Sequence, residues 1–377
     1  MKFRVERSEL SDAVAWTARS LSSKAMVPIL SGLLMEADSN GVRMSTYDLE
    51  NSATVLARAD VVDAGSAVVH GRLLTEIART LPNAPVEVVL DGSRVVVTCG
   101  STRMTLPVFN VEDFPALPAM PESIGSIEAA TFASAVTQVA VAAGKDADTL
   151  QQLTGIRIEL DGGQLTLAAT DRYRLAVRTL DWTAGSDQSH DPVTVPARIF
   201  ADVARAVAGD GGEIRLALGR VAQGEGIVGV EAGSRSTTAR LIELEFPRFR
   251  QLLPDSEDAV AEVETALLQE ALKRARLVLP QATSPVTLRF DDGELTLDAG
   301  SGDSAQATER MPIAFTGVPL QIAFNPTYLA DGLGAIDSPT ARISMTTPSK
   351  PAVITAPGEP GTIADYRYLL MPMRVQS

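Results

Sequence analysis

The sequence predicts an α+β fold, in which a unit made of one helix and several strands occurs six times along 377 residues. Amphipathic helical segments of two recurring kinds alternate with strand-like runs of alternating apolar and polar residues. Short Gly/Asp turns separate these strands, and helices mixed with antiparallel meanders are typical of the α+β class. Pairing the six units predicts three similar domains, at residues 1–122, 123–254 and 255–377.

The first kind of helix opens each predicted domain with two large apolar residues spaced four apart, which places them on one helical face. These pairs are Leu10 and Val14, Phe132 and Val136, and Leu268 and Leu272. Strand-like alternation follows each helix, at residues 42–44, 165–167 and 295–297.

The second kind of helix is a recurring motif, which is the signal of an internal repeat. Residues 71–79 (GRLLTEIAR) and 197–205 (ARIFADVAR) carry cations, apolar pairs and acids at matching places, and residues 327–334 are a fainter copy without the cations. Each copy follows a short strand-like run. Pro196 and Pro326 stand where the first turn of a helix tolerates proline.

Aromatic and proline residues mark where the domains end. The run FPALP at 114–118 recurs as FPRFRQLLP at 246–254, and Asp365-Tyr366-Arg367 stands at the equivalent place in the last domain. The boundaries should therefore fall in the stretches 118–126 and 254–263.

Cations recur on the second kind of helix. Arg72 and Arg79 are seven residues apart, as are Arg198 and Arg205, so each pair shares one helical face opposite the apolar face. For any single helix, an ordinary solvated face explains such cations. Their recurrence at equivalent repeat positions favours a shared function: a cationic surface that holds a polyanion while the acidic remainder of the protein repels it.

The bulk composition excludes several classes of protein. The net charge is −14, and neither a signal peptide nor a membrane-spanning run is present, so we expect a soluble cytoplasmic protein. The phosphate-binding, esterase and metalloprotease motifs are missing, and the chain has only two histidines. We therefore expect no catalysis, no cofactor and no metal. The single Cys99 lies in the alternating stretch 94–99 and reads as a small buried hydrophobe.

The C-terminal stretch 366–374 (YRYLLMPMR) is too apolar for an ordinary frayed terminus. It is either a last core strand or one wall of a docking site, where methionine adapts to several partners.

These motifs resemble the bacterial DNA polymerase III sliding clamp (β subunit), most closely the clamps of high-GC Gram-positive bacteria. The resemblance covers nearly the whole chain, and its most specific markers are ATDRYRLA at 169–176, FPRFRQLLP at 246–254 and LLMPMR at 369–374. It implies a non-catalytic, head-to-tail homodimer that forms a ring around double-stranded DNA. The partners it implies are the polymerase catalytic subunit, the clamp loader, and other polymerases and repair proteins that dock a short peptide.

The resemblance also implies where the partners bind. The peptide-binding pocket would be formed by Leu153, Thr170, Arg172, Arg174, Leu175, Pro247, Gln251, Leu252, Pro351, Leu369, Met371, Pro372, Met373 and Arg374. Among these, Gln251 and Pro351 depart from the commonest family pattern. The DNA-facing cations would be Lys24, Arg72, Arg79, Arg198, Arg205 and Lys273. The dimer interface would join Met104 and Leu106 to Leu277 and Val278.

Two alternatives to the replicative clamp stay open on the sequence. One is a clamp-like scaffold, or specialised second copy, that docks proteins but does not encircle DNA. The other is a hydrolase that uses scattered carboxylates, although no catalytic motif in the sequence supports it.

Overall fold

A computed structural model describes residues 1–21, 27–145, 149–185, 190–209, 211–220, 224–254, 256–300, 305–358 and 364–374. The described residues form six α-helices among antiparallel strands, which confirms the predicted α+β class. By compactness the chain divides into two units. The first contains residues 1–133, β14 (Thr183–Ala184) and residues 199–241, and the second contains residues 134–181, β15 (Val193–Pro196) and the chain from residue 242 onward.

The first unit is built on one fourteen-stranded sheet. Its strands, in spatial order, are β14, β10 (Ser123–Glu128), β16 (Glu213–Arg220), β17 (Gly226–Ala232), β18 (Arg235–Arg240), β4 (Asn51–Ala57), β3 (Gly41–Tyr47), β2 (Gly32–Asp38), β6 (Gly65–His70), β9 (Thr102–Phe109), β8 (Arg94–Cys99), β7 (Val86–Asp91), β1 (Lys2–Val5) and β5 (Asp60–Asp63). β4 pairs with β18 across almost 200 residues of sequence, with Val55 opposite Arg235 and Asn51 opposite Ala239.

The second unit has two sheets. The larger runs through β15, β11 (Gly155–Asp161), β12 (Gln164–Thr170), β13 (Arg174–Asp181), β27 (Tyr366–Leu370), β26 (Ala352–Thr355), β25 (Thr340–Met345), β19 (Ala259–Glu264) and β23 (Ala314–Thr316). The smaller runs through β22 (Ala307–Pro312), β21 (Glu294–Ala299), β20 (Val286–Asp291) and β24 (Leu320–Phe324).

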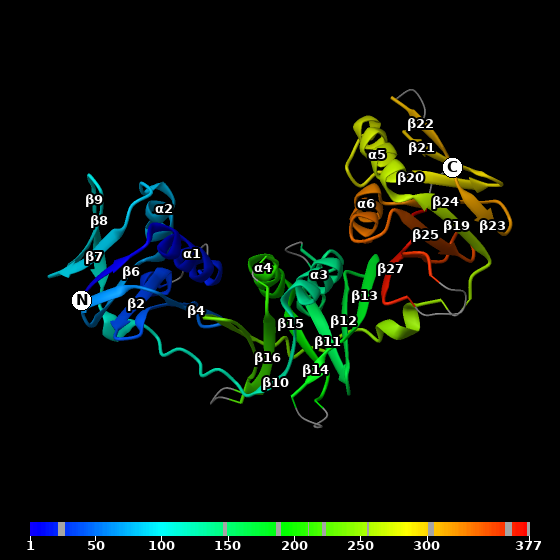
Figure 1. The fold of residues 1–377 in the computed structure, drawn as a ribbon. Helices are drawn as coiled ribbons and strands as arrows, with labels where there is room; N and C mark the ends of the chain where they lie inside the picture. Colours follow the sequence, from blue (N-terminus) through cyan, green and yellow to red (C-terminus); the bar gives the residue numbers. More distant parts are fainter. Residues whose placement is uncertain are drawn as a thin grey trace. The chain divides into compact units, whose positions relative to one another are not determined.

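Within the first unit α1 (Arg7–Thr17) lies beside α2 (Gly71–Thr80), and within the second α5 (Thr265–Ala275) lies beside α6 (Pro326–Gly334) (Figure 1). The other two helices are α3 (Ala129–Ala140) and α4 (Ala197–Val207). Leu10, Val14, Phe132, Val136, Leu268 and Leu272 are all buried. The four-residue spacing thus predicted the apolar faces of α1, α3 and α5 correctly.

The second kind of helix is also confirmed, since residues 71–79, 197–205 and 327–334 lie in α2, α4 and α6, each preceded by a strand. Pro326 is the first residue of α6, as predicted, but Pro196 is the last residue of β15. The predicted start of this helix was therefore one residue too early. Pro196 is the last residue of the β15–β11 pairing, opposite Gly155, and the helix starts at the next residue.

Two of the predicted turns have the backbone that glycine favours. Gly162 joins β11 to β12 with φ 54°, and Gly293 joins β20 to β21 with φ 74°. Cys99 is completely buried in β8, and its thiol lies 3.3 Å from the carbonyl oxygens of Pro82 and Ala84. These carbonyls accept its weak S–H donor, so the thiol behaves as the small core residue that the sequence predicted.

Three sheets carry the strands of all the repeats, and two of them pair strands that are far apart in sequence. The predicted boundary at 122/123 falls at the start of β10, after the 3-10 turn at Val111–Asp113, and the boundary at 254/255 touches residue 255, which lies outside the described residues. Because the sheets continue from one repeat to the next, compactness divides the chain differently from the repeats. The three boundaries therefore stay a prediction. No helix among the described residues is long and apolar enough to cross a membrane.

Candidate functional site

The C-terminal tail contains the last core strand that the sequence allowed, and its role as a wall of a docking site stays a prediction. β27 is an interior strand, paired with β13 on one side and β26 on the other, and Tyr368, Leu369 and Leu370 are buried. After Leu370 the chain leaves the sheet and reaches the surface, with Met371 38% exposed. The tail is thus a core strand followed by a surface segment.

Backbone hydrogen bonds fix this surface segment. The amide of Met371 donates to the carbonyl of Tyr173 at 2.9 Å, and the amide of Met373 donates to the carbonyl of Ala323 at 2.7 Å. Met371, Pro372 and Met373 are therefore held between the β12–β13 turn and the end of β24. An apolar tail anchored by its own backbone offers a rigid wall, which lowers the entropy cost of binding a ligand.

The turn between β12 and β13 is shaped by Asp171. Its carboxylate oxygen Oδ1 accepts hydrogen bonds from the amides of Tyr173 and Arg174, at 3.0 and 3.1 Å. Thr170 donates from its hydroxyl to the carbonyl of Arg174 at 2.7 Å. Arg172 at the tip has φ 81°, a left-handed conformation that costs a non-glycine residue free energy. These bonds hold the strained turn and expose Arg172 and Tyr173.

Arg174, which the resemblance places in the pocket, is largely buried in this structure, and a contact of its side chain with a docked peptide stays a prediction. Its side chain is 6% exposed and pairs with Asp171 at 2.9 Å and with Asp331 of α6 at 2.6 Å. The guanidinium also lies over the ring of Tyr328, 4.2 Å from its centroid. Burial lowers the pKa of Arg174, but its anionic and aromatic neighbours outweigh burial and raise it. The residue is a buried cation that ties the β12–β13 turn to α6.

Two residues that the sequence did not single out lie beside the tail. Tyr173 is 56% exposed and stacks on Tyr328, with ring centroids 6.3 Å apart. The carbonyl of Tyr328 accepts a hydrogen bond from the Tyr368 hydroxyl at 2.8 Å, which links the pair to β27. Tyr328 stands in the repeat at 327–334 where the other copies have an apolar residue, and that substitution was the available signal.

The segment at 246–253 covers one face of the large sheet. Phe246 and Phe249 are buried against a cluster of four residues from β12, β13 and β27. This cluster comprises Ala168, Leu175, Val177 and Leu369. The 3-10 turn at Phe249–Leu252 presents Gln251 and Leu252 outward, and Leu252 is 48% exposed. The two phenylalanines thus anchor the segment and leave its neighbours free for contact.

The predicted pocket therefore separates into a surface and its support. The surface residues are Arg172, Pro247, Gln251, Leu252, Pro351, Met371, Pro372, Met373 and Arg374. We call these nine residues, together with Tyr173 and Tyr328, the tail groove. The supporting residues are buried: Leu153, Thr170, Arg174, Leu175 and Leu369. Pro351 belongs to the surface because Ala352 pairs with Leu370, which puts Pro351 beside Met371.

The predicted DNA-facing cations are exposed wherever the structure describes them. Arg72 and Arg79 lie on the exposed face of α2, and Arg198 and Arg205 on that of α4. Lys273 is exposed on α5 and pairs with Glu270 at 2.6 Å, and Arg205 pairs in the same way with Asp202. Lys24 lies outside the described residues. The shared-face prediction is therefore correct for both arginine pairs.

The predicted interface residues do not all reach the surface. Leu277 is 85% exposed and Met104 is 38% exposed, whereas Leu106 is 1% exposed. Side chains alternate between the two faces of a strand, so Met104 and Leu106 of β9 lie on the same face. Other parts of the chain cover Leu106 but leave Met104 partly exposed. The Leu106 side chain therefore supports β9 from within, and the predicted interface between this strand and the helix end at Leu277 and Val278 stays a prediction.

One edge of β9 is open within the described part of the chain. Its residues 102–107 pair with β8, and only Val108 and Phe109 pair with β6. β22 is likewise an edge strand, paired with β21 alone among the described strands. Open edges of this kind accept another strand.

Among the described residues, no group of three or more His, Cys, Asp or Glu side chains could hold a metal ion. His70 ends β6 and caps α2, its Nδ1 accepting a hydrogen bond from the amide of Leu73. Its role here is structural.

Known proteins resemble this chain over its whole length. Family models of the DNA polymerase III beta subunit match residues 1–118 (N-terminal domain), 126–248 (central domain) and 250–374 (C-terminal domain). The beta sliding clamp of Streptomyces coelicolor is 48% identical over the full length of both chains. The beta sliding clamp homolog GriR of Streptomyces muensis is 40% identical over 99% of both.

Solved structures agree with these matches. A sliding clamp (DNA polymerase III subunit beta) of Pseudomonas aeruginosa, solved with griselimycin bound, is 25% identical and superimposes with a TM-score of 0.90 over all of both chains.

Proposed function

The chain belongs to the DNA polymerase III beta subunit family, and we propose that it is a sliding clamp that encircles double-stranded DNA and gives the replicative polymerase its processivity. It is a non-catalytic subunit. It acts by holding a polymerase on its template. That role requires it to bind DNA and to work in the cytoplasm. The clamp loader and other polymerases and repair proteins would use the same docking surface.

The ring would be a head-to-tail homodimer, the heterologous type of interface that closes when its rotation is right. The open edge of β9 on one protomer would meet the β22 edge of its partner, so that the sheet continues between subunits. Met104 and Leu277, exposed apolar side chains beside these two edges, would be covered by the contact. Leu106 would support β9 from within, and Val278 would lie at the rim.

The observation that carries the DNA-binding role is the pair of arginines repeated on α2 and α4 of a protein with a net charge of −14. These cations, with Lys24 and Lys273, would face the DNA backbone. Phosphate contacts carry no sequence information, so a ring that holds DNA topologically can slide. The acidic remainder of the protein would keep DNA from binding elsewhere.

The tail groove would dock a short peptide from each partner. Met371, Met373, Leu252 and Pro247 offer apolar contact, and the exposed Tyr173 adds an aromatic surface. Arg172 and Arg374 would hold polar or acidic ends of the peptide. A small apolar groove with a few placed polar groups is the usual form of a peptide site.

The test is charge reversal of Arg72, Arg79, Arg198 and Arg205 to glutamate, with the exposed Arg43, Arg94, Arg215 and Arg289 as the matched control set. The first set should abolish clamp-dependent processive synthesis on circular DNA and leave peptide docking intact. The control set should change neither. Normal processivity in the first variant would refute encirclement and favour the docking scaffold.

Light scattering tests the ring separately. A dimer would have twice the mass of the 39.8 kDa chain. A strict monomer at high concentration would show that the ring does not close by itself.

A further inference from the structure

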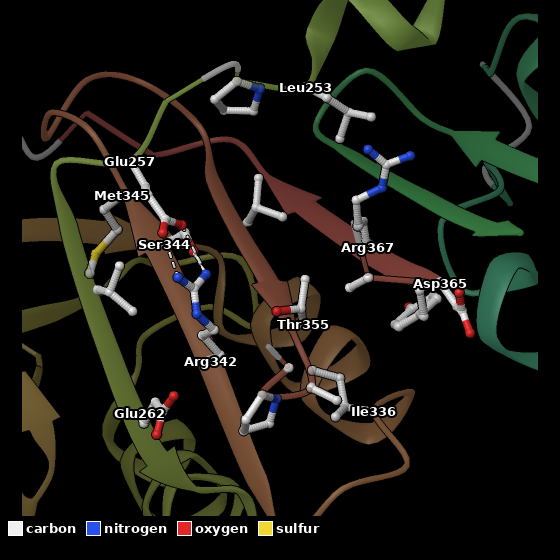
Figure 2. Close-up of a pocket in the computed structure, with 18 of the residues that line it drawn as sticks. Leu253, Glu257, Glu262, Ile336, Arg342, Ser344, Met345, Thr355, Asp365 and Arg367 are labelled. Carbon is white, nitrogen blue, oxygen red and sulfur yellow. Dashed lines mark hydrogen bonds and ion pairs between the residues drawn. The ribbon is translucent and has the colours of Figure 1, made fainter. Parts of the chain in front are cut away.

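A second groove lies on the larger sheet of the second unit, next to the segment at 246–253. It has a volume of about 910 Å³ and crosses β27, β26, β25 and β19. We call it the outer groove, and Figure 2 shows it with Leu253, Glu257, Glu262, Arg342, Thr355 and Arg367 around it. Pro351 lines one end, so this groove starts beside the tail groove. Its volume lies in the range of ligand-binding clefts.

Arg367 is the only arginine of this groove without an ionic partner among the described residues. Arg342 pairs with Glu257 at 2.5 Å, and Arg178 lies 4.0 Å from Asp365. The Nε atom of Arg367 is buried and has no hydrogen-bond partner. Figure 2 shows its guanidinium near Leu253, with no carboxylate bonded to it. Burial, and then the positive charge of Arg250, lower the pKa of Arg367.

Two other buried polar atoms of the groove lining also have no hydrogen-bond partner in the described chain. They are Oε1 of Gln138, on α3, and the hydroxyl of Thr346, just after β25. The amide nitrogen of Gln138 is already used, because it donates to the carbonyl of Ala335 at 3.0 Å. A buried polar atom without a partner costs free energy, so three in one groove point to a ligand that completes them.

The charges of the lining select among ligands. Glu257, Glu262, Asp337 and Asp365 all line the groove, so a polyanion such as nucleic acid would be repelled. A single carboxylate can still reach Arg367. The remaining lining is apolar at Leu253, Val260, Met345 and Val353. The ligand that fits this lining has one acidic group, apolar groups beside it, and free hydrogen-bond donors and acceptors. An extended peptide has all three.

We propose that the outer groove binds an extended peptide segment of a partner protein, in which one aspartate or glutamate pairs with Arg367 and apolar neighbours contact Leu253 and Val353. The backbone of this segment donates to Oε1 of Gln138 and bonds the hydroxyl of Thr346. The inference goes beyond the proposed function, which needs only the tail groove.

The experiment uses full-length protein with the tail groove disabled by L252D and M371D, and a displayed library of random twelve-residue peptides as the probe. Selected peptides should share an acid flanked by apolar residues. One of them, labelled with fluorescein, should bind the otherwise unaltered protein about tenfold more weakly after R367Q, the effect expected for losing one charge-assisted hydrogen-bonded pair. R289Q is the matched control, because the Arg289 side chain is exposed on β20, and it should leave the affinity unchanged.

A double-mutant cycle separates the pair from a general effect. Replacing the peptide acid by its amide should also cost about tenfold on wild-type protein and have little further effect on R367Q. Selected peptides without an acid, unchanged affinity in R367Q, or displacement by inorganic phosphate or oligodeoxythymidine would each overturn the proposal. Processivity and tail-groove docking should be normal in R367Q, and their loss in this variant would overturn the claim that the outer groove acts separately from the tail groove. Absence of processivity in the wild-type protein would count against the proposed function instead.

Discussion

Replacing Arg174 by alanine tests whether this residue contacts a docked peptide or positions the groove. The structure assigns it the second role, because its guanidinium is buried between Asp171 and Asp331 and covers the ring of Tyr328. Removing one partner of a buried ion pair costs about 3–5 kcal/mol. The side chain of Asp331 is 35% exposed, so water compensates part of the loss. We expect R174A to lower the free energy of unfolding by about 2–4 kcal/mol.

D331N is the graded companion of this variant. It keeps the bond from Arg174 to Asp171 and the contact with the Tyr328 ring, so only one hydrogen-bonded ion pair is weakened. We expect a loss of about 1 kcal/mol. Urea unfolding followed by circular dichroism gives both values.

Peptide docking then decides between the two roles. A labelled peptide selected on the tail groove, whose binding is lost in M371D, should bind R174A more weakly and D331N slightly more weakly, in the order of their stabilities. That order is expected because loosening the β12–β13 turn moves Tyr173 and Met371 together, through the hydrogen bond between their backbones. If R174A kept its stability within about 0.5 kcal/mol and still lost docking, Arg174 would contact the peptide directly and the positioning role would be wrong.

Three further predictions concern residues outside the tail groove. L106A should lower the free energy of unfolding by about 2–5 kcal/mol, because it leaves a cavity, whereas M104A should weaken dimerisation in a light-scattering dilution series with little effect on urea unfolding. A hydrogen bond from Arg342 lowers the pKa of Glu257 below 4.5, so its stabilisation is present above that pH and is lost as the pH falls through the lowered value. The difference in melting temperature between E257Q and wild type should therefore be largest near pH 7 and vanish in acid, and an equal difference at every pH would contradict it. Cys99 should react with a thiol reagent only at the rate of unfolding, and fast labelling of the native protein would show that β8 opens locally.

Local patterns predicted the helices well because spacing alone sets which face of a helix is apolar. Leu10 and Val14 are buried for that reason, and Arg72 and Arg79 are exposed for the same reason. Strands gave less. Met104 and Leu106 lie on the same face of β9, yet Met104 is 38% exposed and Leu106 is 1% exposed, because exposure along a strand depends on which other segments cover it.

The sequence identified the residues of the tail groove by resemblance but could not divide them into surface and support. Arg174 stands in a motif beside Arg172, and both are cations near a turn. Only the fold shows that α6, some 157 residues later, brings Asp331 to within 2.6 Å of Arg174. A charged side chain is buried where the fold supplies its partner, and no local pattern records that partner.

The groove itself is a consequence of long-range strand pairing. β27 reaches β13 across more than 180 residues of sequence, with Leu369 opposite Leu175. This register places the end of β27 at the β12–β13 turn, so the tail must leave the sheet beside Tyr173. Its methionines cannot continue the ladder there, because β13 begins at Arg174, and they therefore lie on the surface with their amides bonded to Tyr173 and Ala323. The apolar C-terminal residues form a wall because their strand partner has ended.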